Sequence, residues 1–329
     1  MALRKPLSAL AIALISAASA WAQPAATDAK NWPSRAVHMI VPFPAGSSPD
    51  LIARVLSEKL APALGRPVIV ENRPGAGGNL GTALVAKAAP DGYTIGLSIG
   101  GPLAVNTVLY RKMEYDPFKD LAPVSLVGAS PNLLVVDPKL GVDSVKEFVA
   151  LAKSQPGKLN YGSVGNGSTS HLTMELFKEV AGLDIVHVPY PGSPQVNTAI
   201  LTGQIAAGFV VPATAMPLVQ SGRLKALAVT TSVRSVVLPE YPTLAEAGYP
   251  EVVSTAWQGV VAPAETPRPI VDRLSRELVA VLRGEDVREK MIRLYFQPIG
   301  TAPAGLSNLM RSEVERWGKV IRKTGATAD

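Results

Sequence analysis

Short β-branched runs alternate with amphipathic runs along most of this chain, and this alternation limits the folds open to it. Val37–Val41, Val68–Val70 and Leu133–Val136 have the composition of buried strands. After the first of them, apolar residues recur from Ile52 to Leu60 at the spacing of one helix face. Strands that alternate with helices predict parallel sheets covered by helices on both faces. We therefore expect an α/β fold, and 329 residues suffice for two domains of roughly 150 residues.

The same patterns predict further elements along the chain. Additional strands are expected at Tyr93–Leu97, Leu159–Gly162, Ile185–Val188 and Leu224–Val229. Ser48 is predicted to cap the first helix, with Pro49 in its first position, and Asp143 to cap a later helix. The last third differs, since a strand at Trp257–Val261 precedes two long helices, at about 268–283 and 304–323.

The first residues have the pattern of an export signal. Two basic residues precede an apolar run, Leu7–Ala18, and Ala20-Trp21-Ala22 fits the rule for signal cleavage. The run of about 12 residues is too short to cross a bilayer, which takes about 20. We therefore interpret residues 1–22 as a signal peptide that is cleaved near Ala22–Gln23. Because the chain contains no cysteine to carry a lipid anchor, we expect the mature protein free in the periplasm, not embedded in a membrane.

The formal net charge of +6 raises the question of a nucleic-acid partner. Basic residues late in the chain alternate with acidic ones at helical spacing, as on a solvated helix face. Aromatic residues make up only 5% of the chain, which leaves few for base stacking. We therefore expect no nucleic-acid partner, and a mild positive field that attracts small anions.

Two glycine motifs resemble catalytic or nucleotide-binding loops. Gly96–Gly100 matches G-x-S-x-G, the nucleophile elbow of α/β-hydrolases, with Ser98 as the nucleophile. A hydrolase also needs a later histidine, and only His171 and His187 follow Ser98. Gly75–Gly81 lacks the third glycine of a dinucleotide loop, and the histidines lie too far apart in sequence for a local metal motif. We expect no catalysis, no cofactor and no metal, with the Ser98 hydrolase as the alternative.

Two other loops have the features of an anion site. Ala45–Ser48 and Gly165–Thr169 each follow a strand and open a helix. Each offers small residues, hydroxyls, free backbone N–H groups and the positive end of a helix dipole. One loop per sheet would hold the two ends of a dicarboxylate. The alternative is that these serines and threonines only cap their helices, which is the common role of such residues.

Several motifs keep a fixed order between residues 32 and 323, among them Ile40–Gly46, Val70–Gly78, Pro90–Thr94, His187–Tyr190 and Trp257–Gly259. With these motifs the mature chain resembles the Bug-type, or TctC-like, solute receptors of tripartite tricarboxylate transporters. The resemblance implies a type II periplasmic binding protein, with two α/β lobes and a ligand cleft between them. Residues 23–125 and 255–329 would form lobe 1, and residues 126–254 lobe 2. It also implies a monomeric receptor that closes on a small carboxylate and serves separate membrane subunits.

The resemblance further implies which residues face the ligand. In the first lobe these are the loop after the first strand and a neighbouring glycine-rich loop: Phe43, Ala45, Gly46, Ser47, Ser48 and Asp50, with Ser98, Gly100 and Gly101 nearby. In the second lobe they are Gly165, Asn166, Gly167, Ser168, Thr169, His171, Tyr190 and Gly192.

The chain departs from the family pattern at positions that bear on the ligand. Pro49 replaces a common threonine, and Pro191 stands where a basic residue often follows Tyr190. Val210 stands where many relatives carry an aspartate that would suit a ligand amine. A buried ammonium without a partner is unfavourable, whereas an apolar body gains from contact with Val210. We therefore expect a dicarboxylate without an amine, with an aromatic one such as terephthalate as the leading candidate. The alternative is that Val210 faces the core.

Overall fold

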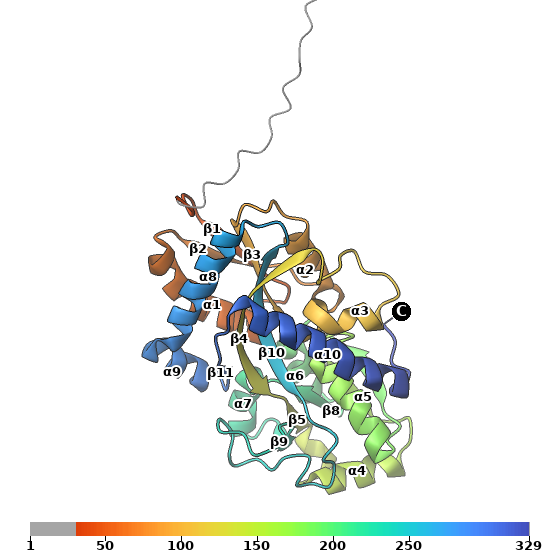
Figure 1. The fold of residues 1–329 in the computed structure, drawn as a ribbon. Coiled ribbons are helices and arrows are strands. Elements are labelled where there is room, and N and C mark those ends of the chain that lie inside the picture. The colour runs from red at the N-terminus through yellow and green to blue at the C-terminus, as the bar shows by residue number, and fades with distance from the viewer. Residues whose placement is uncertain (1–30, 329) are drawn as a thin grey trace, which may run out of the picture.

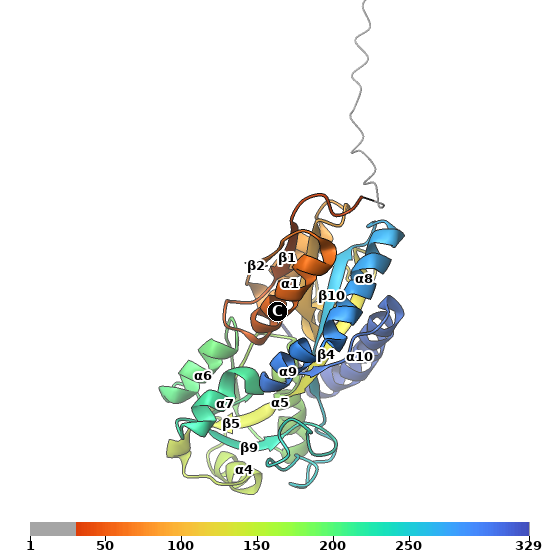
Figure 2. The same cartoon turned by 90° about the vertical axis from the view of Figure 1, so that its left-hand side faces the viewer.

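The computed structural model describes residues 31–328, so the predicted signal peptide and its cleavage site lie outside the described residues. Two β-sheets, each with helices packed against it, form two α/β lobes (Figure 1, Figure 2). Among the helices between residues 31 and 328, none is long and apolar enough to span a membrane.

The upper lobe in Figure 1 is built on a six-stranded sheet with the strand order β11-β4-β10-β3-β1-β2. Its strands are β1 (Val37–Val41), β2 (Val68–Asn72), β3 (Thr94–Ile99), β4 (Leu121–Pro131), β10 (Thr255–Pro263) and β11 (Gln297–Pro298). β1 runs parallel to β2 and β3, but β10 is antiparallel to β3 and β4. The prediction of purely parallel sheets is wrong here, because β4 leads to the other lobe and β10 returns from it.

The lower lobe has a five-stranded sheet in the order β7-β6-β8-β5-β9. Its strands are β5 (Leu133–Val136), β6 (Asn160–Ser163), β7 (Val186–Pro189), β8 (Ala207–Val210) and β9 (Lys225–Val229). β6 is parallel to β7 and β8, whereas β5 is antiparallel to β8 and β9. The second sheet is therefore mixed as well, since β5 continues the path of β4 after a single residue.

The two passages between the sheets lie side by side. The chain leaves the first sheet at Pro131, enters the second at Leu133, and returns between Val229 and Thr255. Asn132 on the outward passage donates its backbone N–H to Thr230 Oγ1 (3.0 Å) and its Nδ2 to Ser254 Oγ (3.2 Å) on the return passage. The division of the lobes after residues 125 and 254 stays a prediction.

Helices cover both faces of each sheet. Those of the first lobe are α1 (Ser48–Leu64), α2 (Asn79–Ala86), α3 (Asn106–Leu109), α8 (Arg268–Arg283), α9 (Glu285–Arg293) and α10 (Pro303–Thr324), with short turns η1 (Ala76–Gly78) and η2 (Gly101–Val105). Those of the second are α4 (Val145–Ser154), α5 (Thr169–Ala181), α6 (Ser193–Leu201) and α7 (Pro212–Gln220), with the turn η3 (Pro138–Leu140). The two long helices predicted in the last third are confirmed as α8 and α10.

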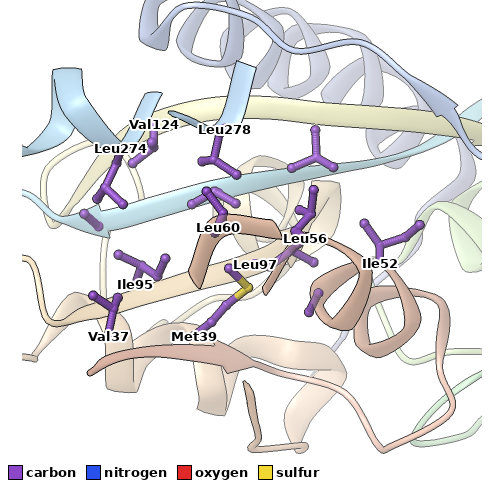
Figure 3. Close-up of a cluster of buried hydrophobic side chains, with 14 of the residues drawn as sticks. Val37, Met39, Ile52, Leu56, Leu60, Ile95, Leu97, Val124, Leu274 and Leu278 are labelled. Carbon is purple, nitrogen blue, oxygen red and sulfur yellow. The ribbon is translucent and has the colours of Figure 1, made fainter. Parts of the chain in front are cut away.

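The last third returns to the first lobe because its apolar faces complete that core. Leu56 and Leu60 of α1 meet Leu274 and Leu278 of α8 in one buried cluster that also contains Met39 of β1 (Figure 3). Ile40, the next residue of β1, points to the opposite face of the sheet. On that face it packs in a second buried cluster with residues of η2 and α10. Two layers of helices thus hold the sheet that carries the first anion loop.

Two predicted helix caps are off by one residue. Ser47, not Ser48, is the N-cap of α1, so Ser48 is the first helical residue and Pro49 the second. Proline is tolerated there because N–H groups of the first turn have no partner within the helix. Ser144, not Asp143, caps α4, and its hydroxyl accepts a bond from Glu147 N–H (3.2 Å). A serine or aspartate offers the same capping chemistry at adjacent positions, which explains the error.

Candidate functional site

A cavity of about 50 Å³ lies where the two lobes meet. Its wall combines the β1–α1 loop and strand β10 of the first lobe with the starts of α5 and α6 and the end of β8 from the second lobe. The lining residues are Phe43, Ser47, Ser48, Pro49, Ile99, Asn132, Val164, Thr169, Ser170, Ser193, Phe209, Val210, Val211, Ala256, Trp257 and Gln258. Most of these side chains are buried. The cavity has room for a handful of water molecules.

Four helices begin at this cavity. Ser48 opens α1, Thr169 opens α5, Ser193 opens α6, and Val211 is the N-cap of α7. The first N–H groups of a helix have no partner within the helix, and the helix dipole adds positive potential there. Within the described part of the chain, no lysine, arginine, aspartate or glutamate lines the cavity. The arrangement therefore favours an anion through backbone groups and hydroxyls instead of a fixed cation.

Two buried polar atoms at the cavity have no partner among the described residues. They are Ser47 Oγ and Gln258 Oε1, on side chains that are 1% and 2% exposed. The Nε2 of Gln258 donates to Ser48 Oγ (3.0 Å), which leaves the hydroxyl hydrogen of Ser48 free to donate. A buried polar group without a hydrogen bond is destabilising by about 1–3 kcal/mol. These atoms are therefore suited to contact a polar ligand or its water.

Aromatic and aliphatic side chains form the rest of the wall. The indole Nε1 of Trp257 donates to Glu313 Oε2 (3.1 Å), and Trp317 Nε1 donates to the same oxygen (2.9 Å). This pair of bonds fixes the ring orientation of Trp257. Gly100 lies against that ring, since a methyl group at this position would come within 2.9 Å of Trp257 Nε1. Gly100 thus supports the wall from outside the cavity.

The structure brings together five of the predicted site residues: Phe43, Ser47, Ser48, Thr169 and Val210. Val210 also belongs to a buried core cluster, so it contacts the cavity and the lobe interior at once. The other predicted residues lie outside the cavity wall, namely Ala45, Gly46, Asp50, Ser98, Gly100, Gly101, Gly165, Asn166, Gly167, Ser168, His171, Tyr190 and Gly192. A direct contact of any predicted residue with a ligand stays a prediction.

Asp50 stabilises the β1–α1 loop instead of facing the cavity. Its Oδ2 accepts the Gly46 N–H (2.9 Å) and the Nε of Arg54 (3.1 Å), and its Oδ1 accepts Asn72 Nδ2 (3.0 Å). The same Asn72 nitrogen donates to the carbonyl of Phe43 (3.0 Å). Because Arg54 pairs with Asp50, the carboxylate adds little net negative charge beside the start of α1.

Acid is expected to weaken this loop. Burial alone would raise the pKa of Asp50, but hydrogen bonds from Arg54, Gly46 and Asn72 outweigh it and hold the pKa below its ordinary value of about 4. A carboxyl of lowered pKa stabilises the fold above its unfolded pKa, and the gain is lost as pH falls through the folded pKa. We therefore expect the free energy of unfolding, measured in urea, to fall below about pH 4 more steeply in the wild type than in Asp50→Asn. Equal acid slopes would contradict this.

Ser98 does not form a nucleophile elbow. It lies inside β3, opposite Gly259 of β10, and its side chain is 1% exposed. Its hydroxyl is hydrogen-bonded to Thr82 Oγ1 (3.0 Å). The elbow requires an exposed serine on a sharp turn between strand and helix. The hydrolase alternative is therefore wrong, because the motif matched the sequence spacing but not the required backbone.

The predicted second-lobe residues mainly shape the loop before α5. Ser168 caps α5, accepting the His171 N–H (3.3 Å) and donating to the Gly165 carbonyl (2.6 Å). His171 Nδ1 accepts the Gly167 N–H (3.2 Å), and its ring stacks on His187 at 4.2 Å. Burial lowers the pKa of His171 to about 4 and that of His187 to about 3. Both rings are therefore neutral near pH 7 and supply no positive charge.

Several lining residues were not predicted from the sequence. Ser193 follows a glycine and precedes a proline at the start of α6, much as Ser48 precedes Pro49 in α1. That repeated Ser-Pro helix start was a usable signal. Asn132 lies between β4 and β5, where no local pattern marks it. Trp257 and Gln258 lie in the predicted strand and in the motif Trp257–Gly259, which indicated the family but not a position at the cavity. Between residues 31 and 328, no group of three or more His, Cys, Asp or Glu side chains could hold a metal ion.

The sequence model of one protein family, described as "Tripartite tricarboxylate transporter family receptor", matches residues 52–326. The chain belongs to this receptor family. Protein BugT of Bordetella pertussis is 40% identical over 303 residues, which cover 92% of this chain and 93% of BugT. A protein of Pseudomonas sp. strain P51, from the tcbD-tcbE intergenic region, is 37% identical over 291 residues, 88% of this chain and 86% of that protein.

Solved structures of receptors have the same fold. Rpa4515 of R. palustris, in a structure with adipate, has a TM-score of 0.87 and 36% identity, covering 90% of this chain and 99% of that chain. MatC from Rhodopseudomonas palustris, with bound malate, has a TM-score of 0.84 and 33% identity, covering 88% and 100%. The predicted family and the two-lobed α/β fold of periplasmic binding proteins are thereby confirmed. Members of the family are solute receptors that work with membrane transporter subunits, and they are not enzymes.

Proposed function

We propose that this receptor binds a small dicarboxylate without an amine in the cavity between its lobes and presents it to separate membrane subunits for uptake. The observation that carries the proposal is the convergence of helix N-termini from both lobes on an uncharged cavity. Adipate and malate in the structures of two similar receptors are acids of this class. The protein would act as a monomer in the periplasm, after removal of residues 1–22.

One carboxylate would bind at each lobe. In the first lobe, Ser47 Oγ, the Ser48 hydroxyl and the start of α1 offer donors to one end of the ligand. In the second lobe, Thr169, Ser170 and Ser193 stand at the starts of α5 and α6 and suit the other end. A ligand held at both ends stabilises the closed arrangement over an open one. Opening would occur at the paired passages near Asn132 and Ser254.

The middle of the cavity is expected to select the ligand body. Phe43, Phe209, Val210 and Trp257 offer apolar surface, which favours a hydrocarbon or aromatic body by about 25 cal/mol per Å² buried. Terephthalate remains the leading aromatic candidate, with adipate and malate as aliphatic ones. Aspartate and glutamate carry an ammonium group, and among residues 31–328 no carboxylate lines the cavity to pair with it, so they are expected to bind poorly.

Titration calorimetry of the wild type with terephthalate, adipate, malate, citrate, aspartate and glutamate tests this function. We expect measurable binding of at least one amine-free dicarboxylate and at least tenfold weaker binding of the two amino acids, as the loss of about 1.4 kcal/mol implies. Tight binding of an amino acid with the other acids inert would overturn the amine-free class. Absence of binding for the whole panel would overturn the dicarboxylate assignment.

Two N-cap serines form a matched pair of variants. Ser47 and Ser168 cap α1 and α5 with similar extended backbone, but only the Ser168 side chain makes a capping bond. We expect Ser47→Ala to weaken dicarboxylate binding by about ten- to a hundredfold, the value of a charge-assisted hydrogen bond, with little change in stability. Ser168→Ala should instead lower the free energy of unfolding by about 1 kcal/mol. Calorimetry and urea denaturation of both variants would show the contrast, and unchanged affinity in Ser47→Ala would contradict it.

A further inference from the structure

The glycine motif Gly75–Gly81, which lacks the third glycine of a dinucleotide loop, lies where the two lobes touch. Gly77, in η1 of the first lobe, faces the loop Gly165–Ser168 of the second. A methyl group on Gly77 would lie 2.9 Å from the Asn166 carbonyl oxygen, and one on Gly165 would lie 2.7 Å from Gly77 Cα. Carbon atoms that are not bonded do not approach this closely, so the two backbones meet directly because both residues lack a side chain.

A second pair of glycines meets beside the first. A methyl group on Gly101, at the start of η2, would lie 3.0 Å from the Gly167 carbonyl oxygen. One on Gly167 would lie 1.9 Å from Asn106 Oδ1. Asn106 is fully buried, and this oxygen has no partner among the described residues. The space that a side chain of Gly167 would need is therefore occupied by the other lobe.

This contact is connected to the ligand cavity on both sides. Gly78, which follows Gly77, lies against the ring of Phe43, since a methyl group there would come within 2.8 Å of Phe43 Cζ. The loop Gly165–Ser168 leads directly into Thr169 and Ser170, which line the cavity. The distance between the glycine pairs therefore sets how closely the start of α5 approaches the first lobe.

We propose that Gly77 and Gly101 of the first lobe, with Gly165 and Gly167 of the second, form a closure contact that positions the start of α5 for binding. The proposal rests on the proposed function and deepens it by naming residues that act without touching the ligand. A side chain at this contact holds the lobes apart. A hydrogen bond stretched beyond 3.5 Å is lost, so a ligand held by both lobes then keeps the bonds of only one.

Gly101 allows the cleanest test. Gly77, Gly165 and Gly167 have positive φ angles of 60°, 112° and 77°, so any side chain there also strains the backbone. Gly101 has no such angle, and Gly101→Leu therefore adds bulk at the contact without that strain. For Gly77→Ala the matched control is Gly65→Ala, because Gly65 has a φ of 72° and no atom within 4 Å of an added methyl group.

The experiment measures affinity and closure in the same proteins. Since the chain has no cysteine, fluorophores can be attached at Lys146→Cys on α4 and Arg276→Cys on α8, one exposed site per lobe. We expect Gly101→Leu and Gly77→Ala to weaken dicarboxylate binding by roughly five- to a hundredfold, as overpacking of a tight contact does, and to reduce the change in energy transfer on binding. Gly65→Ala should leave both unchanged.

Affinity and closure like the wild type in Gly101→Leu, with an unchanged melting temperature, would overturn the closure contact. A different result would overturn the proposed function, namely that no acid of the panel binds the wild type. In that event the contact is tested without ligand, by the rate at which cysteines at Ala76→Cys and Asn166→Cys form a disulfide. Gly101→Leu must slow this rate if the glycines control the approach, and equal rates would overturn it.

Discussion

Val210→Asp is expected to abolish most of the affinity for an amine-free dicarboxylate. Val210 is 1% exposed and lines the cavity, where it is the last residue of β8. A carboxylate introduced there would repel the ligand anion by about 3–4 kcal/mol at a distance of 4–5 Å, which corresponds to a loss of a hundred- to a thousandfold. The same charge would pair with a ligand ammonium, so aspartate or glutamate should bind the variant better than the wild type.

A neutral control separates charge from polarity at this position. Val210→Asn has almost the shape of the aspartate variant but no charge, and we expect it to lose far less affinity. Burial should raise the pKa of the introduced carboxyl, so affinity in Val210→Asp is expected to recover as the pH is lowered. Calorimetry at neutral and acidic pH measures both effects. If Val210→Asp and Val210→Asn bind the dicarboxylate equally well, charge at this position does not select the ligand.

The parts of the site that the sequence predicted are those built from neighbouring residues. Ser47, Ser48 and Thr169 stand where a strand ends and a helix begins, and both signals are local patterns of hydrophobicity and capping. The pattern placed the loops correctly, although the cap of α1 was displaced by one residue. A helix start and an anion site use the same N–H groups, so capping chemistry led to loops that contribute residues to the cavity wall.

The unpredicted parts depend on strand pairing over long distances in sequence. Gln258 reaches Ser48 only because β10 pairs with β3 in the first sheet. β4, which was not predicted, contains two prolines and a glycine that interrupt the pattern of a strand. Proline cannot donate to a neighbouring strand, so such residues argue against a strand in a purely local analysis. Both sheets are mixed because β4 and β10 carry the chain between the lobes, and β5 continues the path of β4.

The family resemblance implies that His171 faces the ligand, and the structure gives its ring other partners. The ring accepts a hydrogen bond from Gly167 and stacks on His187. Both rings lie in the second lobe, where burial lowers their pKa values. The burial depends on the packing of α5 against the sheet, which the sequence around His171 does not reveal.

Leu278→Ala is expected to cause a large loss of stability without changing the intrinsic affinity for the ligand. Leu278 of α8 is fully buried and packs with Leu56 and Leu60 of α1, far along the chain from it (Figure 3). Truncation of a buried leucine to alanine destabilises a protein by about 2–5 kcal/mol, through lost contacts and the cavity that remains.

Arg276→Ala, on the exposed face of the same helix, is the control and should change the free energy of unfolding by at most about 0.5 kcal/mol. Urea denaturation compares the two variants, and calorimetry of the folded Leu278→Ala protein should give the wild-type affinity within about twofold, since α8 lies outside the cavity. Equal stability of the two variants would mean that α8 does not pack on α1 in solution.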